Sequence, residues 1–263
     1  MSELRIQGIG RTFDGVRGGA PTVALQPTDL AVASNDFITI LGPSGCGKST
    51  LLRIVAGLET PSTGRVLLDG VPVSRPGPDR GMVFQSYTLF PWLTVQENIR
   101  FGLRERGLDA AAQADVAARY IAKVGLEGFE HHHPKMLSGG MQQRTALARA
   151  LAPTPKVLLL DEPFGALDTQ TRALMQELLL EIWEANRKTV LFVTHDIDEA
   201  VFMANRVLVM TARPGRVKAV VDVALARPRH YTVKTSPEFA ALKARLTDEV
   251  RAESIRAVEL EGR

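Results

Sequence analysis

Short apolar runs recur along the chain and predict the strands of a mainly parallel sheet. Residues 37–41 (FITIL) and 157–160 (VLLL) show no alternation of polar and apolar side chains, which is typical of strands buried on both faces. Residues 4–9 and 23–32 alternate more, and we expect them to be edge strands of a separate antiparallel layer. Further strands of the main sheet are expected near Arg80, Thr189 and Arg206.

Helical patterns fill the stretch between two of these strands. Apolar residues there recur at spacings of three and four, the period of an amphipathic helix. We therefore expect a helical lobe, residues 86–155, inserted into a core lobe made of residues 1–85 and 156–225.

A tail of residues 226–263 follows the core lobe. Ser236 and Pro237 are typical of a helix start. We expect a helix over 236–250 to pack on the core lobe or on a neighbour, and order to fade beyond Arg251, where the charge density rises. The apolar stripe of this helix consists of Phe239, Leu242, Leu246 and Val250.

The sequence GPSGCGKS (42–49) stands between strand 37–41 and a predicted helix over 49–58. It fits a glycine-rich phosphate loop, in which backbone N–H groups wrap phosphates and Lys48 neutralises their charge. The dipole of a helix that begins at the loop favours the same anion, and Ser49 is the expected Mg²⁺ ligand. The predicted nucleotide contacts are Gly42, Pro43, Ser44, Gly45, Cys46, Gly47, Lys48, Ser49 and Thr50.

Two acids follow the buried run 157–160. Ligands of parallel sheets bind at the carboxyl edge of the strands, so Asp161 is placed to hold Mg²⁺ and Glu162 to act as general base on the attacking water. The alternative is that Glu162 is a solvated acid at a strand end. The phosphate loop on the same chain favours the catalytic role.

His195 and Gln85 close two further apolar strands, 189–193 and 81–85. The same sheet edge would collect both side chains. His195 can donate a hydrogen bond to a γ-phosphate, and Gln85 can reach both Mg²⁺ and the water. A single His or Gln is more often structural, but its place at a strand end favours a catalytic role here.

The sequence LSGGMQQR (137–144) opens another predicted helix. Ser138, Gly139 and Gly140 provide a hydroxyl and exposed N–H groups at its N-terminus, which suits a second anion site. The chain has one phosphate loop, so this second site should serve the γ-phosphate bound by a partner. The alternative is an ordinary serine cap followed by a glycine turn.

Taken in this order and at this spacing, the motifs resemble the ATP-binding subunits of ABC transporters, over nearly all of residues 1–225. The resemblance implies an α/β fold: a P-loop NTPase (RecA-like) core, an antiparallel β subdomain and an inserted α-helical subdomain. It implies a head-to-tail homodimer that binds two ATPs with Mg²⁺, each between the phosphate loop of one copy and the signature of the other. The implied roles are Q-loop Gln85, signature residues Leu137, Ser138, Gly139, Gly140 and Gln142, catalytic Glu162, D-loop Asp168 and switch His195.

Two positions depart from the family pattern. Gly165 begins the D-loop segment GALD, where many members have serine. Phe13 occupies the position expected to stack on adenine, where tyrosine is commoner. Stacking needs only a ring face, so Phe13 should serve.

The composition agrees with a motor that lacks its own channel. In 263 residues, 45% of them hydrophobic, no apolar stretch approaches the roughly 20 residues of a membrane span. No signal-peptide pattern is present, and the single Cys46 fits a reducing compartment. We expect a peripheral protein on the cytoplasmic face of the inner membrane, docked on two permease subunits. It would meet a periplasmic or extracellular substrate-binding protein only indirectly, and a net charge of +3 gives no argument for nucleic acid.

Two local clusters allow more than one interpretation. The aromatic segment 86–99 is either core or, as the family implies, the surface that receives the permease's coupling helix. Three consecutive histidines, 131–133, cannot all face one ion in a regular element, and no cysteine completes a ligand set. We interpret them as surface residues.

The cargo can be judged only by kinship. Segments such as VTHDIDEAVFMANRVLVM (193–210) and RPGRV (213–217) resemble importers of nitrate, alkanesulfonates and taurine, and KVGLEGFE (123–130) leans toward the taurine members. The predicted order is taurine, other alkanesulfonates, then nitrate. The alternative is the motor of an exporter, or of an importer for an unrelated substrate. A repair or translation ATPase would carry a coiled-coil insertion or a second cassette, and a small-molecule kinase would lack LSGG.

Overall fold

The computed structural model describes residues 3–15 and 19–261, which form two compact units. One unit extends up to Pro76 and resumes at Thr189, and the other runs from Gly77 to Lys188. This partition follows packing within the chain and differs from the predicted lobes, whose boundaries at 85/86, 155/156 and 225/226 remain a prediction.

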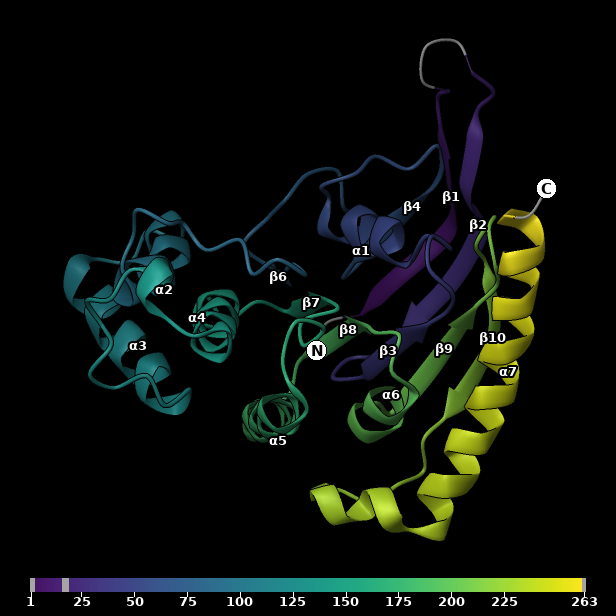
Figure 1. The fold of residues 1–263 in the computed structure, drawn as a ribbon. Helices are drawn as coiled ribbons and strands as arrows, with labels where there is room; N and C mark the ends of the chain where they lie inside the picture. Colours follow the sequence, from purple (N-terminus) through teal and green to yellow (C-terminus); the bar gives the residue numbers. More distant parts are fainter. Residues whose placement is uncertain (1–2, 16–18, 262–263) are drawn as a thin grey trace. The chain divides into compact units, whose positions relative to one another are not determined.

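The parallel sheet of the first unit is built around β3 (Phe37–Leu41). Its neighbours are β8 (Thr189–Val193) and β9 (Arg206–Met210), and β10 (Val217–Asp222) pairs antiparallel with β9 (Figure 1). Every residue of β3 and β8 is buried. This confirms the prediction that strand 37–41 is buried on both faces, and β8 is buried in the same way.

An antiparallel sheet belongs to the same unit. Its strand order is β2-β1-β4-β5, with β1 at Leu4–Phe13, β2 at Thr22–Val32, β4 at Thr63–Leu68 and β5 at Val71–Pro72. The prediction of an edge strand is therefore wrong for β1, which lies between β2 and β4. The reason is the strand TGRVLL, which supplies a second partner for β1.

Three helices complete the first unit. Helix α1 (Lys48–Ala56) follows β3 and ends at Gly57, whose left-handed backbone (φ 76°) suits glycine. Helix α6 (Ile197–Met203) follows β8, and α7 (Pro237–Glu261) comes after a short 3₁₀ turn, η3 (Tyr231–Thr235).

The last helix is longer than predicted. Ser236 Oγ caps it by accepting from the N–H of Phe239 at 3.1 Å. Phe239 and Leu246 are buried, and the buried Glu253 carboxylate accepts from the Ala212 N–H at 3.0 Å. These contacts hold the helix beyond Arg251, where we expected order to fade.

The second unit combines a parallel strand pair with helices. Strand β6 (Arg80–Val83) pairs with β7 (Val157–Asp161), and α4 (Gly139–Leu151) contacts β6. Helix α2 (Val95–Glu105) packs on α3 (Ala110–Lys123) and on α4 (Figure 1). The remaining elements are the 3₁₀ turn η2 (Pro134–Met136) and helix α5 (Thr169–Ala185). Within the described residues, no helix is long and apolar enough to cross a membrane.

Candidate nucleotide-binding site

The loop between β3 and α1 has the geometry of a phosphate cradle. Lys48 is buried, and its ammonium donates to the carbonyls of Gly42 at 2.8 Å and Pro43 at 2.9 Å, which arches the side chain back over the loop. Gly47 caps α1 with φ 98°. A Cβ at Gly47 would stand 2.7 Å from Leu25 Cδ2, so only glycine fits this turn.

Residues 213–215 brace the back of the phosphate loop. Arg213 Nε donates to the carbonyl of Gly45 at 3.1 Å. Gly215 N–H donates to the carbonyl of Ala24 at 3.0 Å, so the segment also fastens to β2. The sequence RPGRV indicates only kinship, and nothing in its local pattern predicts a supporting role for Arg213.

Cys46 is fully buried. Burial raises the pKa of its thiol, and the nearby Lys48 charge opposes that shift in part. The buried thiol makes the folded chain itself the main shield of the sulfur, so Cys46 would contribute to a nucleotide through its backbone.

Two further predicted residues belong to the first unit. His195 is exposed and lies two residues beyond the end of β8. Phe13 is the last residue of β1, and the Arg11 guanidinium lies 4.5 Å from its ring centroid. A cation on one ring face leaves the other face for stacking.

The acids and the glutamine belong to the second unit. Asp161 is the buried last residue of β7. Gln85 Nε2 donates to Glu162 Oε2 at 3.4 Å, so two of the predicted catalytic side chains meet. Gln85 lies two residues past the end of β6, because the strand stops at Val83 rather than at Gln85.

Glu162 has a strained backbone. Its φ of 45° is in the left-handed region, which a non-glycine residue rarely adopts. The Glu162 carbonyl accepts from the Gly165 N–H at 3.2 Å, which closes a tight turn directly after the strand. Such strain is concentrated at functional sites.

The signature segment folds as the N-terminus of α4. Ser138 Oγ accepts from the Met141 N–H at 3.3 Å, which confirms the hydroxyl-capped helix start. A Cβ at Gly140 would stand 2.9 Å from Thr171 Cγ2 of α5. Gln142 Nε2 donates to the carbonyls of Pro134 and Leu137, at 3.0 and 3.3 Å, and thereby orders the buried Leu137 and its neighbours.

Asp168 caps α5. Its carboxylate accepts from the N–H groups of Gln170 at 3.1 Å and Thr171 at 3.0 Å. A hydrogen bond from the Thr171 side chain, followed by those from the N–H groups of Thr171 and Gln170, lowers the pKa of Asp168, so it is a carboxylate near neutral pH.

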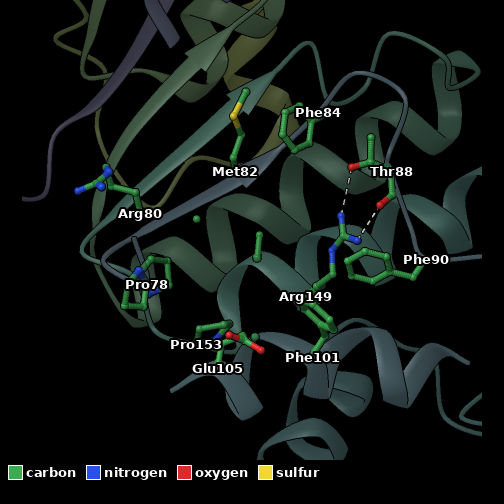
Figure 2. Close-up of a pocket in the computed structure, with 14 residues that line it drawn as sticks. Pro78, Arg80, Met82, Phe84, Thr88, Phe90, Phe101, Glu105, Arg149 and Pro153 are labelled. Carbon is green, nitrogen blue, oxygen red and sulfur yellow. Dashed lines mark hydrogen bonds between the residues drawn. The ribbon is translucent and has the colours of Figure 1, made fainter. Parts of the chain in front are cut away.

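Arg149 is a residue that the sequence interpretation missed. Its guanidinium donates to the carbonyls of Tyr87 at 3.0 Å and Thr88 at 2.7 Å. Figure 2 shows the contact with Thr88 and the neighbouring ring of Phe90, whose centroid lies 5.4 Å from the guanidinium carbon. Tyr87 and Thr88 have φ values of 57° and 45°. Arg149 of α4 thus holds a strained turn that begins two residues after Gln85.

A pocket of about 620 Å³ lies beside this arginine (Figure 2). Its walls are mostly apolar, from β6, α2 and the end of α4, and Arg80, Glu105 and Arg149 add charge. The aromatic segment 86–99 is only partly core, since Trp92 is 70% exposed. The histidines have local contacts: His131 Nδ1 lies 3.1 Å from Gln96 Nε2, and the His132 ring lies on that of Phe129.

The strand, loop and helix that contain Lys48 define a P-loop nucleoside triphosphatase. Comparison with known proteins narrows the class. The family described as ABC transporter matches residues 25–165. The chain belongs to the ABC transporter family and has the fold of its ATPase cassette.

Several relatives match over most of their length. An uncharacterized ABC transporter ATP-binding protein of Methanocaldococcus jannaschii is 48% identical over 257 residues, 98% of this chain and 94% of the relative. A nitrate import ATP-binding protein of Synechocystis is 45% identical, with 95% and 98% covered. An aliphatic sulfonates import ATP-binding protein of Bacillus thuringiensis is 47% identical, with 84% and 86% covered.

Solved structures agree with the fold. A dimeric ATP-binding cassette in a post-hydrolysis state, bound to ADP and Pi, superposes with a TM-score of 0.75 at 32% identity. The match covers 85% of this chain and all of that one. The sequence-based interpretation as an α/β ABC ATPase is confirmed.

Proposed function

We propose that this protein is the ATP-hydrolysing motor of an importer for a small sulfonate or related anion. The observation that carries the proposal is the Gln85–Glu162 pair, 3.4 Å apart at the ends of two parallel strands, in a chain that also has a complete phosphate loop. A carboxylate held by an amide at a strand end is suited to orient and deprotonate water.

The chemistry of these residues fits ATP and Mg²⁺. Lys48 and the backbone N–H groups of residues 42–50 would bind the phosphates, and Ser49, Asp161 and Gln85 would hold Mg²⁺, which supplies charge stabilisation when bound. Glu162 takes a proton from water as general base. His195 donates a hydrogen bond to the γ-phosphate, and Phe13 stacks on adenine.

The proposed working unit is a head-to-tail homodimer. Leu137, Ser138, Gly139, Gly140 and Gln142 of one copy would contact the nucleotide bound by the other, with Asp168 communicating across the interface. Support comes from Ser138, which presents a hydroxyl-capped helix N-terminus, and from the dimeric cassette of similar fold.

The proposed membrane partner is a pair of permease subunits, which would place the protein on the cytoplasmic face of the inner membrane. The pocket of about 620 Å³ is the best candidate for a coupling helix. Thr88 and Phe90, two of its lining residues, follow Gln85 closely in the chain. Phe90 and Phe101 form its aromatic wall, with ring centroids 4.5 Å apart. Trp92 adds a largely exposed apolar surface next to Phe90. A substrate-binding protein would act on the far side of the permease.

The cargo is proposed from the relatives, because none of the described site residues would touch it. Relatives named for nitrate and for aliphatic sulfonates are 45% and 47% identical to this chain. Taurine stays our first candidate, followed by other alkanesulfonates and nitrate.

The test is deletion of this gene in its own host, followed by uptake of labelled taurine, an alkanesulfonate and nitrate in parallel. We expect one uptake activity to be lost, and wild type but not Lys48→Ala to restore it. Persistence of all three activities, in a strain whose other uptake systems for these anions are also deleted, would contradict the proposed cargo class.

A further inference from the structure

A second cavity, of about 350 Å³, lies in the helical part of the second unit. Three of its lining residues are cations: Arg106 directly after α2, and Arg119 and Lys123 on α3. Thr154 and Asn186 contribute polar groups. Of the residues that line this cavity, none is an Asp or a Glu.

These charges are not neutralised by the protein. Across residues 3–15 and 19–261, Arg106, Arg119 and Lys123 form no ion pair with a carboxylate. Arg106 Nη1 donates instead to the Pro153 carbonyl and to Thr154 Oγ1, which fixes its guanidinium at the cavity. Lys123 lies over the Tyr120 ring, with Nζ 5.4 Å from its centroid.

A fourth cation stands close by. Lys188 is 8% exposed, and burial lowers its pKa to about 8, with Lys123 and Arg106 repelling the ammonium as further causes. At neutral pH it is still charged, and it lies close enough to Lys123 and Arg106 for their charges to act on it. The three cations that line the cavity are exposed, whereas Lys188 beside them is buried, so an anion bound among them would relieve the repulsion on the Lys188 ammonium.

We infer that this cavity binds a small dianionic tetrahedral oxyanion, best a phosphate monoester, away from the nucleotide site. Arginine forks match the geometry of phosphate and sulfate oxygens, and lysine adds point charge. Three cations around one cavity, with Lys188 close by, favour a dianion over a monoanion such as nitrate or a sulfonate. Leu103, Leu108 and Val116 line the same cavity and suit a short carbon skeleton.

The cavity lies beside the connection from α4 to β7, so a bound anion could influence that connection. Pro153 and Thr154, held by Arg106, belong to the connection from α4 to β7. That connection joins the signature helix to the strand that ends in Asp161. An anion bound by Arg106 would therefore stiffen a link between two parts of the ATPase machinery. The inference does not depend on the identity of the cargo.

The test is calorimetric titration of the full-length protein at constant ionic strength, with Mg-ADP saturating so that the phosphate loop is occupied. Glycerol 3-phosphate, inorganic phosphate and sulfate are compared with methanesulfonate and nitrate. We expect saturable binding of the dianions and at least ~10-fold weaker binding of the monoanions. Tighter binding of glycerol 3-phosphate would identify an ester as the ligand, and tighter binding of inorganic phosphate would support the free ion.

Variants assign the binding to this cavity. Arg119→Gln with Lys123→Gln should weaken dianion binding at least ~10-fold, whereas Arg104→Gln, an exposed cation of α2 that does not line the cavity, should leave it unchanged. A thermal melt confirms that each variant is folded. Absence of saturable dianion binding, or binding equally strong in the double variant, would overturn the inference.

Discussion

Glu162 shows at the residue scale how a backbone can prepare a catalytic group. Its φ of 45° is unfavourable for a side-chain-bearing residue, and the turn that imposes it also directs the carboxylate to Gln85 at 3.4 Å. We predict that Glu162→Gln slows ATP turnover at least ~100-fold, because a general base is lost. Nucleotide affinity should be retained. Phosphate release and nucleotide binding measure the two effects separately, and normal turnover would remove Glu162 from this role.

The lowered pKa of Lys188 predicts that the stability of the protein depends on pH. Its folded-state pKa of about 8 lies below the ordinary 10.5. The unfolded chain therefore binds more protons between these values, and the free energy of unfolding rises with pH there. Below about pH 8 both states are protonated, and the cost of the buried charge is present in full.

The matched variant is Lys188→Met, which keeps the volume and removes the charge. We expect it to be more stable than wild type by about 1–3 kcal/mol at pH 7, with the difference shrinking as the pH rises to 10. Denaturant unfolding of both proteins across this range measures it. A stability difference between the two proteins that does not change with pH would show that the buried charge of Lys188 is not its cause.

At the scale of elements, Arg149 connects α4 to the turn after β6. Its two hydrogen bonds go to the carbonyls of Thr88 and Tyr87, which stand 61 and 62 positions earlier in the sequence. We predict that Arg149→Lys, which keeps the charge but not the two-pronged contact, lowers kcat about 10-fold with KM for ATP unchanged, because the turn that positions Gln85 loosens. Arg104→Lys, at an exposed position of α2, is the control. An unchanged kcat would show that the turn holds without the arginine.

The aromatic wall of the larger pocket leads to a prediction about association with the permease. Phe90→Ala with Trp92→Ala should leave nucleotide binding intact and weaken association with the permease, because the apolar surface for a partner helix is lost. Co-purification of the whole transporter measures it, with the exposed Leu174→Ala on α5 as control. Undiminished co-purification of the double variant would count against this docking surface.

Local chemistry explains which elements could be predicted from the sequence. Buried runs such as Phe37–Leu41 and caps such as Ser138 and Ser236 are determined within a few residues. The interior place of β1 could not be predicted, since it depends on a partner strand about 60 residues away. Arg149 is similar, because its importance comes from contacts that only the folded chain creates. The cationic cavity likewise needs residues from α2 and α3 and from the segments that follow α4 and α5.

At the scale of the whole molecule, the proposed homodimer builds each site from two chains. One chain would supply Lys48 and its partner would supply Ser138. Singly altered chains can then complement each other, because a C2 dimer contains two such composite sites. A dimer of one Lys48→Ala chain and one Ser138→Arg chain has both changes in one site and leaves the other intact.

We therefore predict that mixing the two inactive single variants restores ATPase activity. With half of the dimers mixed and one of two sites intact, independent sites would give about a quarter of wild-type activity. The control is the chain that carries both changes, mixed with wild-type chain. There every mixed dimer has one change in each site, so the hybrids contribute nothing. An inactive mixture of the single variants, together with about a quarter of wild-type activity in the control after wild-type homodimers are subtracted, would rule out a site shared between chains, because a site confined to one chain stays intact in every wild-type subunit.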